Sequence, residues 1–419
     1  MEYAAYTVQG DTVTLYRLYG TGPVADVPDR IDGKRVEILA DHLFAGEMSA
    51  FVRLEELSLA RLSGDSWVKV EEEEVIDPEE EDSPRLSAAP GAGISPRVIN
   101  SHRPDGIMGF PERRNEEALC GDRVQEIRIP EGVKQIGNYA FYGLYQLREI
   151  RFPSTVQKIG WGMFNGCRKV NRLVFNLKKD AKEKPDNSGW PAQTPPILKE
   201  ILDCVPNEIE VIVRELNFVP GCDARQHRRV TEFASENNKS SSRTERWEEK
   251  NTELYRLRFP AYYEEGKENT PARIIEIIYH GTGHQYRNCF LNRVLQFDRY
   301  DEIFPLAAAQ ESPVTNVHLI LNRLLSGPAP KEEIRTRYLE YLRKENGTMM
   351  DEILSDPELE PEKVLVNLDN MAYFASALLD ESIQIASGRK NSRAVSCLME
   401  IRSREQTSPA DRRKGRYQL

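Results

Sequence analysis

The sequence predicts an α+β protein in which a solenoid of short parallel strands is followed by an all-α helical module. Two observations carry this prediction. The N-terminal half contains a repeat with a constant offset, and from Ala272 onward the apolar residues change to helical spacing.

The repeat becomes visible when the segment from Val124 is aligned with the segment from Leu147, an offset of 147 − 124 = 23 residues. Each unit begins with two apolar residues two positions apart, such as Ile127 and Ile129, which point to one face of a short strand. One unit cannot bury its apolar side, whereas stacked units share a continuous core. The two copies predict these core residues: Ile127, Ile129, Val133, Ile136, Phe141, Ile150, Phe152, Val156, Ile159 and Phe164.

A glycine closes each unit, at Gly143 and Gly166, where a positive φ lets the chain turn back toward the next strand. The N-terminal stretch has the same spacing in a diverged form. Its matching residues are Val36, Leu39, Phe44 and Gly46, which correspond to Val133, Ile136, Phe141 and Gly143. We therefore expect a further repeat coil before residue 70.

The unit resembles the BspA-like leucine-rich repeat, which reads roughly I-x-I-P-x-x-V-x-x-I-G-x-x-A-F-x-G-C. Residues 150–167 follow this pattern, with Met163 in place of the usual Ala. The resemblance implies a leucine-rich-repeat solenoid, and it implies binding to other proteins rather than catalysis.

Composition and pattern together divide the chain into six predicted segments. They are an N-terminal cap with a diverged repeat (1–70), an acidic insertion rich in Pro, Gly and Ser (71–120), the leucine-rich repeats (121–235), a linker or docking segment (236–260), an α-helical domain (261–405) and a basic tail (406–419). The insertion holds too few apolar residues to offset its ordering entropy, so we expect it to form a loop between coils.

The α-helical domain is predicted from groups of apolar residues at helical spacing. Ile274, Ile275 and Ile278 would share one face of a helix. Similar groups follow at 290–295, 317–325 and 338–342, and the prolines between them mark where helices should end. The last two segments, 371–387 and 392–403, resemble the helix-turn-helix of an ankyrin-type unit. A helical bundle or an ankyrin-like module is therefore expected.

Charge and motifs exclude several functions. The formal net charge of −10 disfavours a nucleic-acid binder, since that affinity depends on a positive surface. No signal-peptide pattern and no run of about 18 apolar residues is present, so we expect a cytoplasmic protein that does not enter a membrane. No phosphate-binding glycine loop or GxSxG elbow occurs, and we expect neither a cofactor nor an enzyme.

The segment His280-Gly-Thr-Gly-His284, with Cys289 close behind, is the main candidate for chemistry. Two histidines four positions apart would form a helical metal site only if the segment were a helix, and the two glycines between them indicate a turn. We therefore interpret the segment as a structural turn between helices. A metal site or a nucleophilic cysteine formed by these three residues is the alternative.

Exposed aromatic residues are the main candidates for binding. Tyr139, Tyr142, Tyr145 and Trp161 lie in the repeats but outside the core register, and aromatic side chains on a rigid scaffold are frequent anchors of interfaces. Packing over the edge of the stack is their alternative role. The first functional hypothesis is a scaffold or recognition protein for a protein partner. The rivals are a metal- or thiol-dependent effector enzyme and a regulatory sensor of a multi-protein bacterial system.

Overall fold

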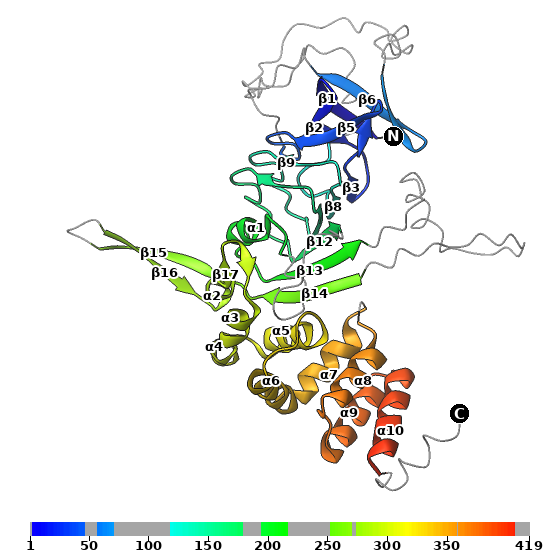
Figure 1. Cartoon of the computed structure of the whole chain (residues 1–419), viewed down its shortest axis with the longest axis vertical. Helices are drawn as coiled ribbons and strands as arrows, with labels where there is room; N and C mark the ends of the chain where they lie inside the picture. Colours follow the sequence, from blue (N-terminus) through cyan, green and yellow to red (C-terminus); the bar gives the residue numbers. More distant parts are fainter. Residues whose placement is uncertain are drawn as a thin grey trace, which may run out of the picture. The chain divides into compact units, whose positions relative to one another are not determined.

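The computed structural model describes residues 2–46, 57–70, 118–178, 194–216, 252–269, 274–357 and 359–406. These residues form two compact units, the first ending at Lys169 and the second beginning at Val170 (Figure 1). Most of the predicted acidic insertion, the first part of the predicted linker and the basic tail after Gln406 lie outside the described residues. No helix among the described residues is long and apolar enough to span a membrane.

Unit 1 is built almost wholly from short strands. They are β1 (Tyr3–Gln9), β2 (Thr12–Tyr19), β3 (Val24–Asp26), β4 (Arg30–Ile31), β5 (Lys34–Leu39), β6 (Ser58–Ser63), β7 (Ser66–Lys69), β8 (Glu126–Arg128), β9 (Gln135–Ile136), β10 (Glu149–Pro153) and β11 (Lys158–Ile159). One sheet has the order β11-β9-β5-β2-β1-β6-β7-β4, and β4 also pairs with β5. The N-terminal strands thus close into a ring of pairings, which a simple stack of parallel coils does not have.

The repeat itself forms the predicted parallel ladders. Ile150 of β10 pairs with Ile127 of β8, and Ile159 of β11 pairs with Ile136 of β9, each at the predicted offset of 23 residues. The diverged coil is also found, because Leu39 of β5 pairs with Ile136. The repeat in the sequence is therefore a repeat of backbone pairing as well.

The interior of unit 1 is filled by the repeated apolar positions. Of the residues expected in the core, Ile159 is half-buried and the others are buried. Three phenylalanines occupy the same position in successive coils and contact one another. The ring centroids of Phe44 and Phe141 lie 5.9 Å apart, and those of Phe141 and Phe164 lie 5.6 Å apart. Tilted rings in contact at one repeat position make a continuous core that no single coil could form.

Unit 2 begins with strands. β12 (Arg172–Lys178) runs parallel to β13 (Ile209–Leu216), and β14 (Thr252–Phe259) pairs antiparallel with β13. The short helix α1 (Leu198–Cys204) lies between β12 and β13 in the chain. Residues 252–259, within the predicted linker or docking segment, form this strand β14, in which Phe259 is fully buried.

Two hairpins occupy the stretch that helical spacing had assigned to helices. β15 (Tyr263–Asn269) pairs with β16 (Ile274–His280), so Ile274, Ile275 and Ile278 lie in a strand. β17 (Phe290–Leu291) pairs with β18 (Val294–Leu295) around Asn292 and Arg293, both with positive φ. Two successive residues with positive φ form a tight turn whose twist matches that of the two paired strands. This turn makes a hairpin of residues 290–295, although their apolar spacing also suits a helix.

Helices make up the rest of unit 2. They are α2 (Gly283–Arg287), α3 (Phe297–Glu302), α4 (Phe304–Gln310), α5 (Pro313–Leu325), α6 (Glu332–Lys344), α7 (Asn346–Ser355), α8 (Pro361–Asn370), α9 (Ser376–Gly388) and α10 (Ser392–Gln406). The predicted helical C-terminal region is thus present. Pro328 and Pro330 lie between α5 and α6, as predicted, whereas Pro313 begins α5, at a position where a missing N–H costs nothing. Helix α10 packs on α8 and α9, while the ankyrin-like assignment stays a prediction.

Candidate binding surface

One backbone position of the repeat is left-handed in three successive coils of unit 1. His42 has a φ of 60°, Tyr139 a φ of 53° and Gly162 a φ of 64°. These residues are equivalent, since 139 − 42 = 97 and 162 − 139 = 23 are the offsets of the strand pairings. A left-handed conformation costs an L-residue roughly 1 to 2 kcal/mol, so side-chain contacts must hold His42 and Tyr139 there.

Those contacts are made between rings. The rings of His42 and Tyr139 are stacked with centroids 5.1 Å apart, and Trp161 meets Tyr139 edge-on at the same distance. Tyr142 also meets Tyr139 in an edge-on arrangement, with ring centroids 5.9 Å apart. At the next coil, where Gly162 carries no side chain, the ring of Tyr139 covers the glycine: a Cβ built on Gly162 would lie 2.5 Å from Tyr139 Cε1. We call His42, Tyr139, Tyr142 and Trp161 the aromatic surface.

A row of polar groups holds the backbone beneath the aromatic surface. The N–H of Asn138 donates to Asp41 Oδ1 at 2.7 Å, and its Nδ2 donates to Asp41 Oδ2 at 3.1 Å. On the other side, Asn138 Oδ1 accepts a hydrogen bond from the backbone N–H of Trp161 at 2.9 Å. One side chain thus links three coils and fixes the backbone from which Trp161 projects.

The aromatic surface is open to solvent. Trp161 is 72% exposed, and Tyr142 is exposed as well. Tyr145, the fourth predicted residue, is also exposed, and its ring lies beside Gly143 and Gly166. The structure therefore brings together three of the four predicted aromatics. It adds His42, which the 97-residue offset of the diverged coil would have identified.

The last residue of the repeat unit is structural. The Cys167 thiol donates to the carbonyl of Phe141 in the preceding coil at 3.0 Å, and burial raises its pKa to about 12. Residues 114–184 match the family described as the BspA type leucine rich repeat region.

This chain contains BspA-type leucine-rich repeats.

Comparison with solved structures finds the crystal structure of a T. pallidum leucine-rich-repeat protein. It is 17% identical in sequence, covers 42% of this chain and 73% of its own chain, and gives a TM-score of 0.15. No curated protein matches the chain.

The His280–His284 segment, outside the matched repeats, is a turn, as expected, but it joins the strand β16 to the helix α2 rather than two helices. Its glycines permit close packing, because a Cβ on Gly283 would lie 2.1 Å from the carbonyl oxygen of Pro260. Thr282 is fully buried, and its N–H and hydroxyl both donate to Glu311 Oε1, at 2.8 and 2.6 Å.

The three predicted ligand candidates occupy separate environments. His280 stacks on Tyr263 at 4.4 Å, and His284 stacks on Tyr279 at 3.7 Å. Cys289 is buried, and burial raises the pKa of its thiol to about 12. A thiol with such a pKa stays protonated near neutral pH, where a nucleophile or a metal ligand requires the thiolate. No group of three or more His, Cys, Asp or Glu residues within the described chain is arranged to hold a metal ion.

Arg287 is the polar residue of unit 2 that sequence reasoning missed. Its guanidinium is buried and donates to the backbone carbonyls of five residues: Leu202, Val205, Asn207, Pro260 and Gly283. Burial lowers its pKa to about 10, which leaves it charged at neutral pH. Five donors in a fixed fork can satisfy carbonyls from three chain segments at once.

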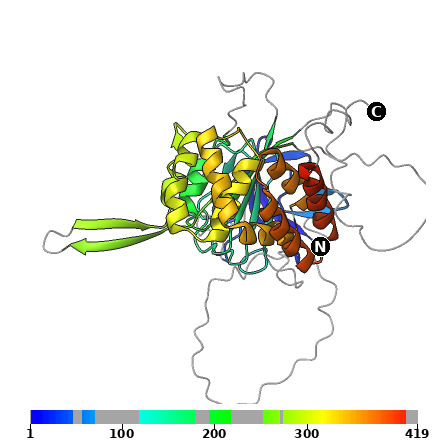
Figure 2. The same cartoon turned by 90° about the horizontal axis from the view of Figure 1, so that it is seen from below.

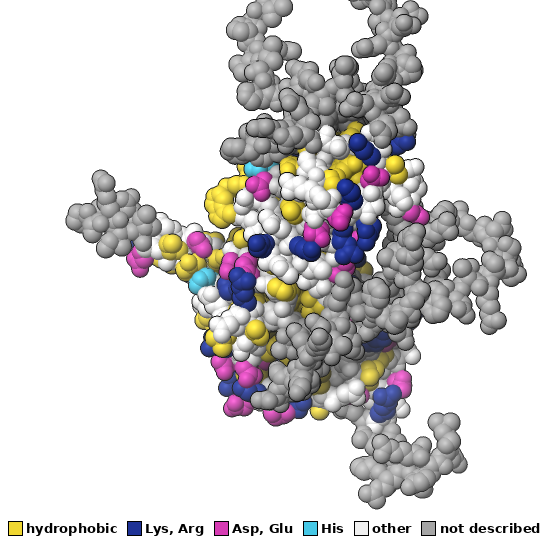
Figure 3. Space-filling view, turned by 45° about the horizontal axis from the view of Figure 1, so that its top comes forward, with side chains coloured by type: hydrophobic (Ala, Val, Ile, Leu, Met, Phe, Trp, Pro, Cys, Tyr) yellow, Lys and Arg dark blue, Asp and Glu magenta, His cyan; other side chains and the backbone are white. Residues whose placement is uncertain are grey.

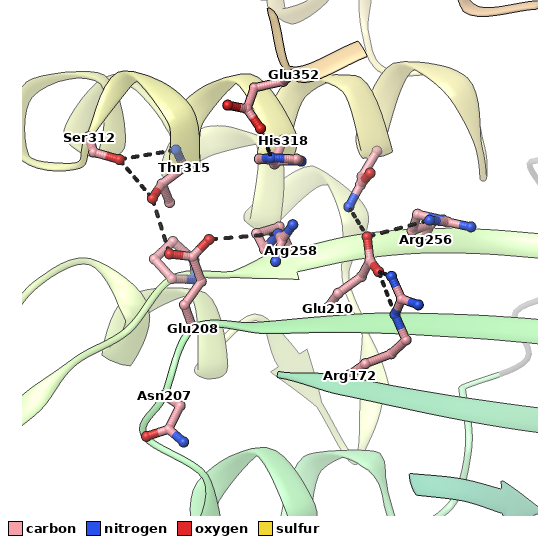
Figure 4. A network of polar contacts seen from close by, with 12 residues as sticks. Arg172, Asn207, Glu208, Glu210, Arg256, Arg258, Ser312, Thr315, His318 and Glu352 are labelled. Carbon is pink, nitrogen blue, oxygen red and sulfur yellow. Dashed lines mark hydrogen bonds and ion pairs between the residues drawn. The ribbon is translucent and has the colours of Figure 1, made fainter. Parts of the chain in front are cut away.

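A second polar cluster joins the sheet of unit 2 to its helices (Figure 4). Glu210 accepts from Arg172 Nε at 3.0 Å and from Asn322 Nδ2 of α5 at 3.1 Å, and Arg256 lies 3.5 Å away. Burial acts to raise the pKa of Glu210, but the neighbouring arginines outweigh burial and leave the pKa below its ordinary value. The hydrogen bond from Asn322 joins α5 to Glu210 of β13, so this cluster supports the packing of α5 on the sheet.

Proposed function

We propose that this protein is a non-catalytic recognition or scaffold protein whose aromatic surface binds a protein partner. The observation that carries the proposal is the exposure of Trp161 beside Tyr139, a residue held in a left-handed conformation. Strain of this kind persists where the surrounding structure holds it, and it gathers at functional sites.

The chemistry of the aromatic surface suits a protein interface. Large rings bury much apolar area at little loss of side-chain entropy, and tryptophan and tyrosine are enriched among residues that dominate binding energy. The rings contact one another, and the hydrogen bonds among Asp41, Asn138 and Trp161 hold the backbone beneath them. The side chains therefore lose little conformational entropy when a partner binds. Leucine-rich repeats are generally used for protein interaction, which agrees with this proposal.

Capture of binding partners from an extract of the native host tests the proposal. Tagged wild type is compared with Trp161→Ala, Tyr139→Gly and a control, Val68→Ala, which removes an exposed residue of β7 outside the aromatic surface. We expect one partner to be retained by wild type and by the control and lost with both aromatic variants.

Tyr139→Gly separates recognition from stability. Glycine accepts a positive φ without strain, so the variant should keep nearly all of its stability while it loses the rings' central contact. A partner retained equally by all four proteins would show that recognition lies elsewhere and would refute the proposal.

A further inference from the structure

The hairpin of β15 and β16 forms an arm that extends away from the helices of unit 2 (Figures 1 and 2). The two strands make a sheet of their own, and neither pairs with another strand in the described part of the chain. Both outer edges therefore present backbone N–H and C=O groups. A two-stranded sheet of this kind is marginally stable in water and offers a template for an added strand.

The base of the arm is anchored firmly. Gly283 packs against the Pro260 carbonyl, and Thr282 is hydrogen-bonded twice to Glu311. The stacked rings of Tyr279 and His284 join the end of β16 to α2. These contacts set the direction in which the arm leaves the unit. An arm held at its base presents its edges in a fixed direction, which lowers the ordering cost of binding.

One face of the arm combines apolar residues with carboxylates. Cross-strand pairs on this face are Glu264 with Tyr279 and Gly266 with Ile277, and the register continues with Glu268 and Ile275. Ile277 is 52% exposed, and a Cβ built on Gly266 would meet nothing within 4 Å, so the sheet face at Gly266 is open to an incoming side chain. Figure 3 shows hydrophobic side chains interspersed with acidic ones along the arm.

The charge of this face decides between possible occupants. A second copy paired along the outer edge of β15 would place the glutamate positions of one strand across from those of the other, and like charges across strands are destabilising. A strand with an aliphatic residue between two basic residues, all on one side, fits better. Its aliphatic side chain covers Gly266 and touches Ile277, while its basic side chains flank it, one at the carboxylate of Glu264 and the other beside register position 268.

We propose that the outer edge of β15 is a docking site for an extended, basic strand of another protein. The backbone of that strand pairs with β15, and its alternate side chains carry the specificity. This surface is distinct in residues and in partner chemistry from the aromatic surface of the repeats.

The test uses the full chain and a fluorescein-labelled peptide containing Lys-Thr-Ile-Thr-Lys, which places two lysines and one isoleucine on one side of a strand. Two control peptides carry Glu-Thr-Ile-Thr-Glu and Lys-Ile-Thr-Thr-Lys, which change the charge and the side of the isoleucine respectively. Fluorescence anisotropy should show saturable binding of the first peptide, with affinity at least about tenfold above either control, the loss expected for one buried aliphatic contact or charge pair.

Variants of the arm then locate the site. Ile277→Ser and Glu264→Lys should each weaken the binding of the first peptide about tenfold, whereas Val366→Ser, which changes an exposed valine of α8, should leave it unchanged. Hydrogen exchange should show new protection of the β15 amides. These outcomes would support the proposal.

Three other outcomes would overturn it. They are no binding of a large excess of the first peptide, equal binding of all three peptides, and sedimentation velocity showing a dimer of the wild type that Ile277→Ser dissociates. The last result would make a second copy of this chain the occupant of the arm.

Discussion

The side-chain oxygen of Asn138 accepts a hydrogen bond from the backbone N–H of Trp161, 23 residues further along the chain. The same side chain donates to Asp41 in the preceding coil, so one amide spans three coils. This relationship explains how the backbone of an exposed tryptophan is held in place although solvent surrounds most of its ring.

Asn138→Ala should therefore weaken unit 1 and loosen Trp161. Two hydrogen bonds of the side chain are lost, one of them partly charged, which corresponds to about 2 kcal/mol in the free energy of unfolding. Urea denaturation followed by tryptophan fluorescence measures the change. Asn138→Asp serves as a comparison, since it keeps the acceptor for Trp161 but faces the Asp41 carboxylate. Unchanged stability in the alanine variant would mean that water replaces the bridge.

Gly160→Ala should destabilise the repeats strongly. A Cβ at this position would lie 2.3 Å from both the backbone N of Asn138 and the carbonyl carbon of Gly137, so the coils would have to separate. We expect a loss of about 3 kcal/mol or more, at the upper end of overpacking effects. The control is Gly46→Ala, where a Cβ would meet nothing within 4 Å and the loss should stay below about 1 kcal/mol. Similar midpoints for both variants in thermal unfolding would contradict the close approach of the coils.

Arg287→Lys should destabilise unit 2 although the charge is kept. A lysine has three donors, which cannot replace a guanidinium bonded to five carbonyls, so at least two buried carbonyls lose their partner. The expected loss is about 3 kcal/mol, measured by chemical denaturation. Arg293→Lys is the matched control, because its side chain is exposed and its ion pair with Glu200 contributes little. A loss no larger than that of the control would show that water satisfies the carbonyls.

Glu210 should make the stability of unit 2 depend on pH. Burial alone would raise its pKa, but Arg256, Arg258 and Arg172 lower it below the ordinary value of 4.5. A carboxyl whose pKa is lower in the folded state stabilises the fold above the unfolded pKa, and this contribution is lost as pH falls through the folded pKa. The free energy of unfolding of wild type should therefore decline in acid below about pH 4.5 more steeply than that of Glu210→Gln. Parallel curves would show that another group causes the decline.

The repeats could be predicted from sequence because their information is local and periodic. An offset of 23 residues places Ile127 beside Ile150 and Phe141 beside Phe164, so a one-dimensional pattern already specifies the strand register and the core. The same register predicted the exposed aromatic residues, because a ring at a position outside the core points away from the interior of the coil. His42 occupies the same repeat position as Tyr139, at the 97-residue offset of the diverged coil, but it was not predicted because a histidine stands there in place of the tyrosine.

The sequence by itself determined the repeat, the family to which those repeats belong and the presence of helices in the C-terminal region. Only the tertiary structure decided that Ile274, Ile275 and Ile278 form an arm and that Arg287 collects five carbonyls. The physical reason is that short apolar clusters suit a strand and a helix equally, and the choice depends on a pairing strand and on packing around the glycines of the following turn. A buried arginine likewise acquires its role only when segments distant in sequence bring their carbonyls to it.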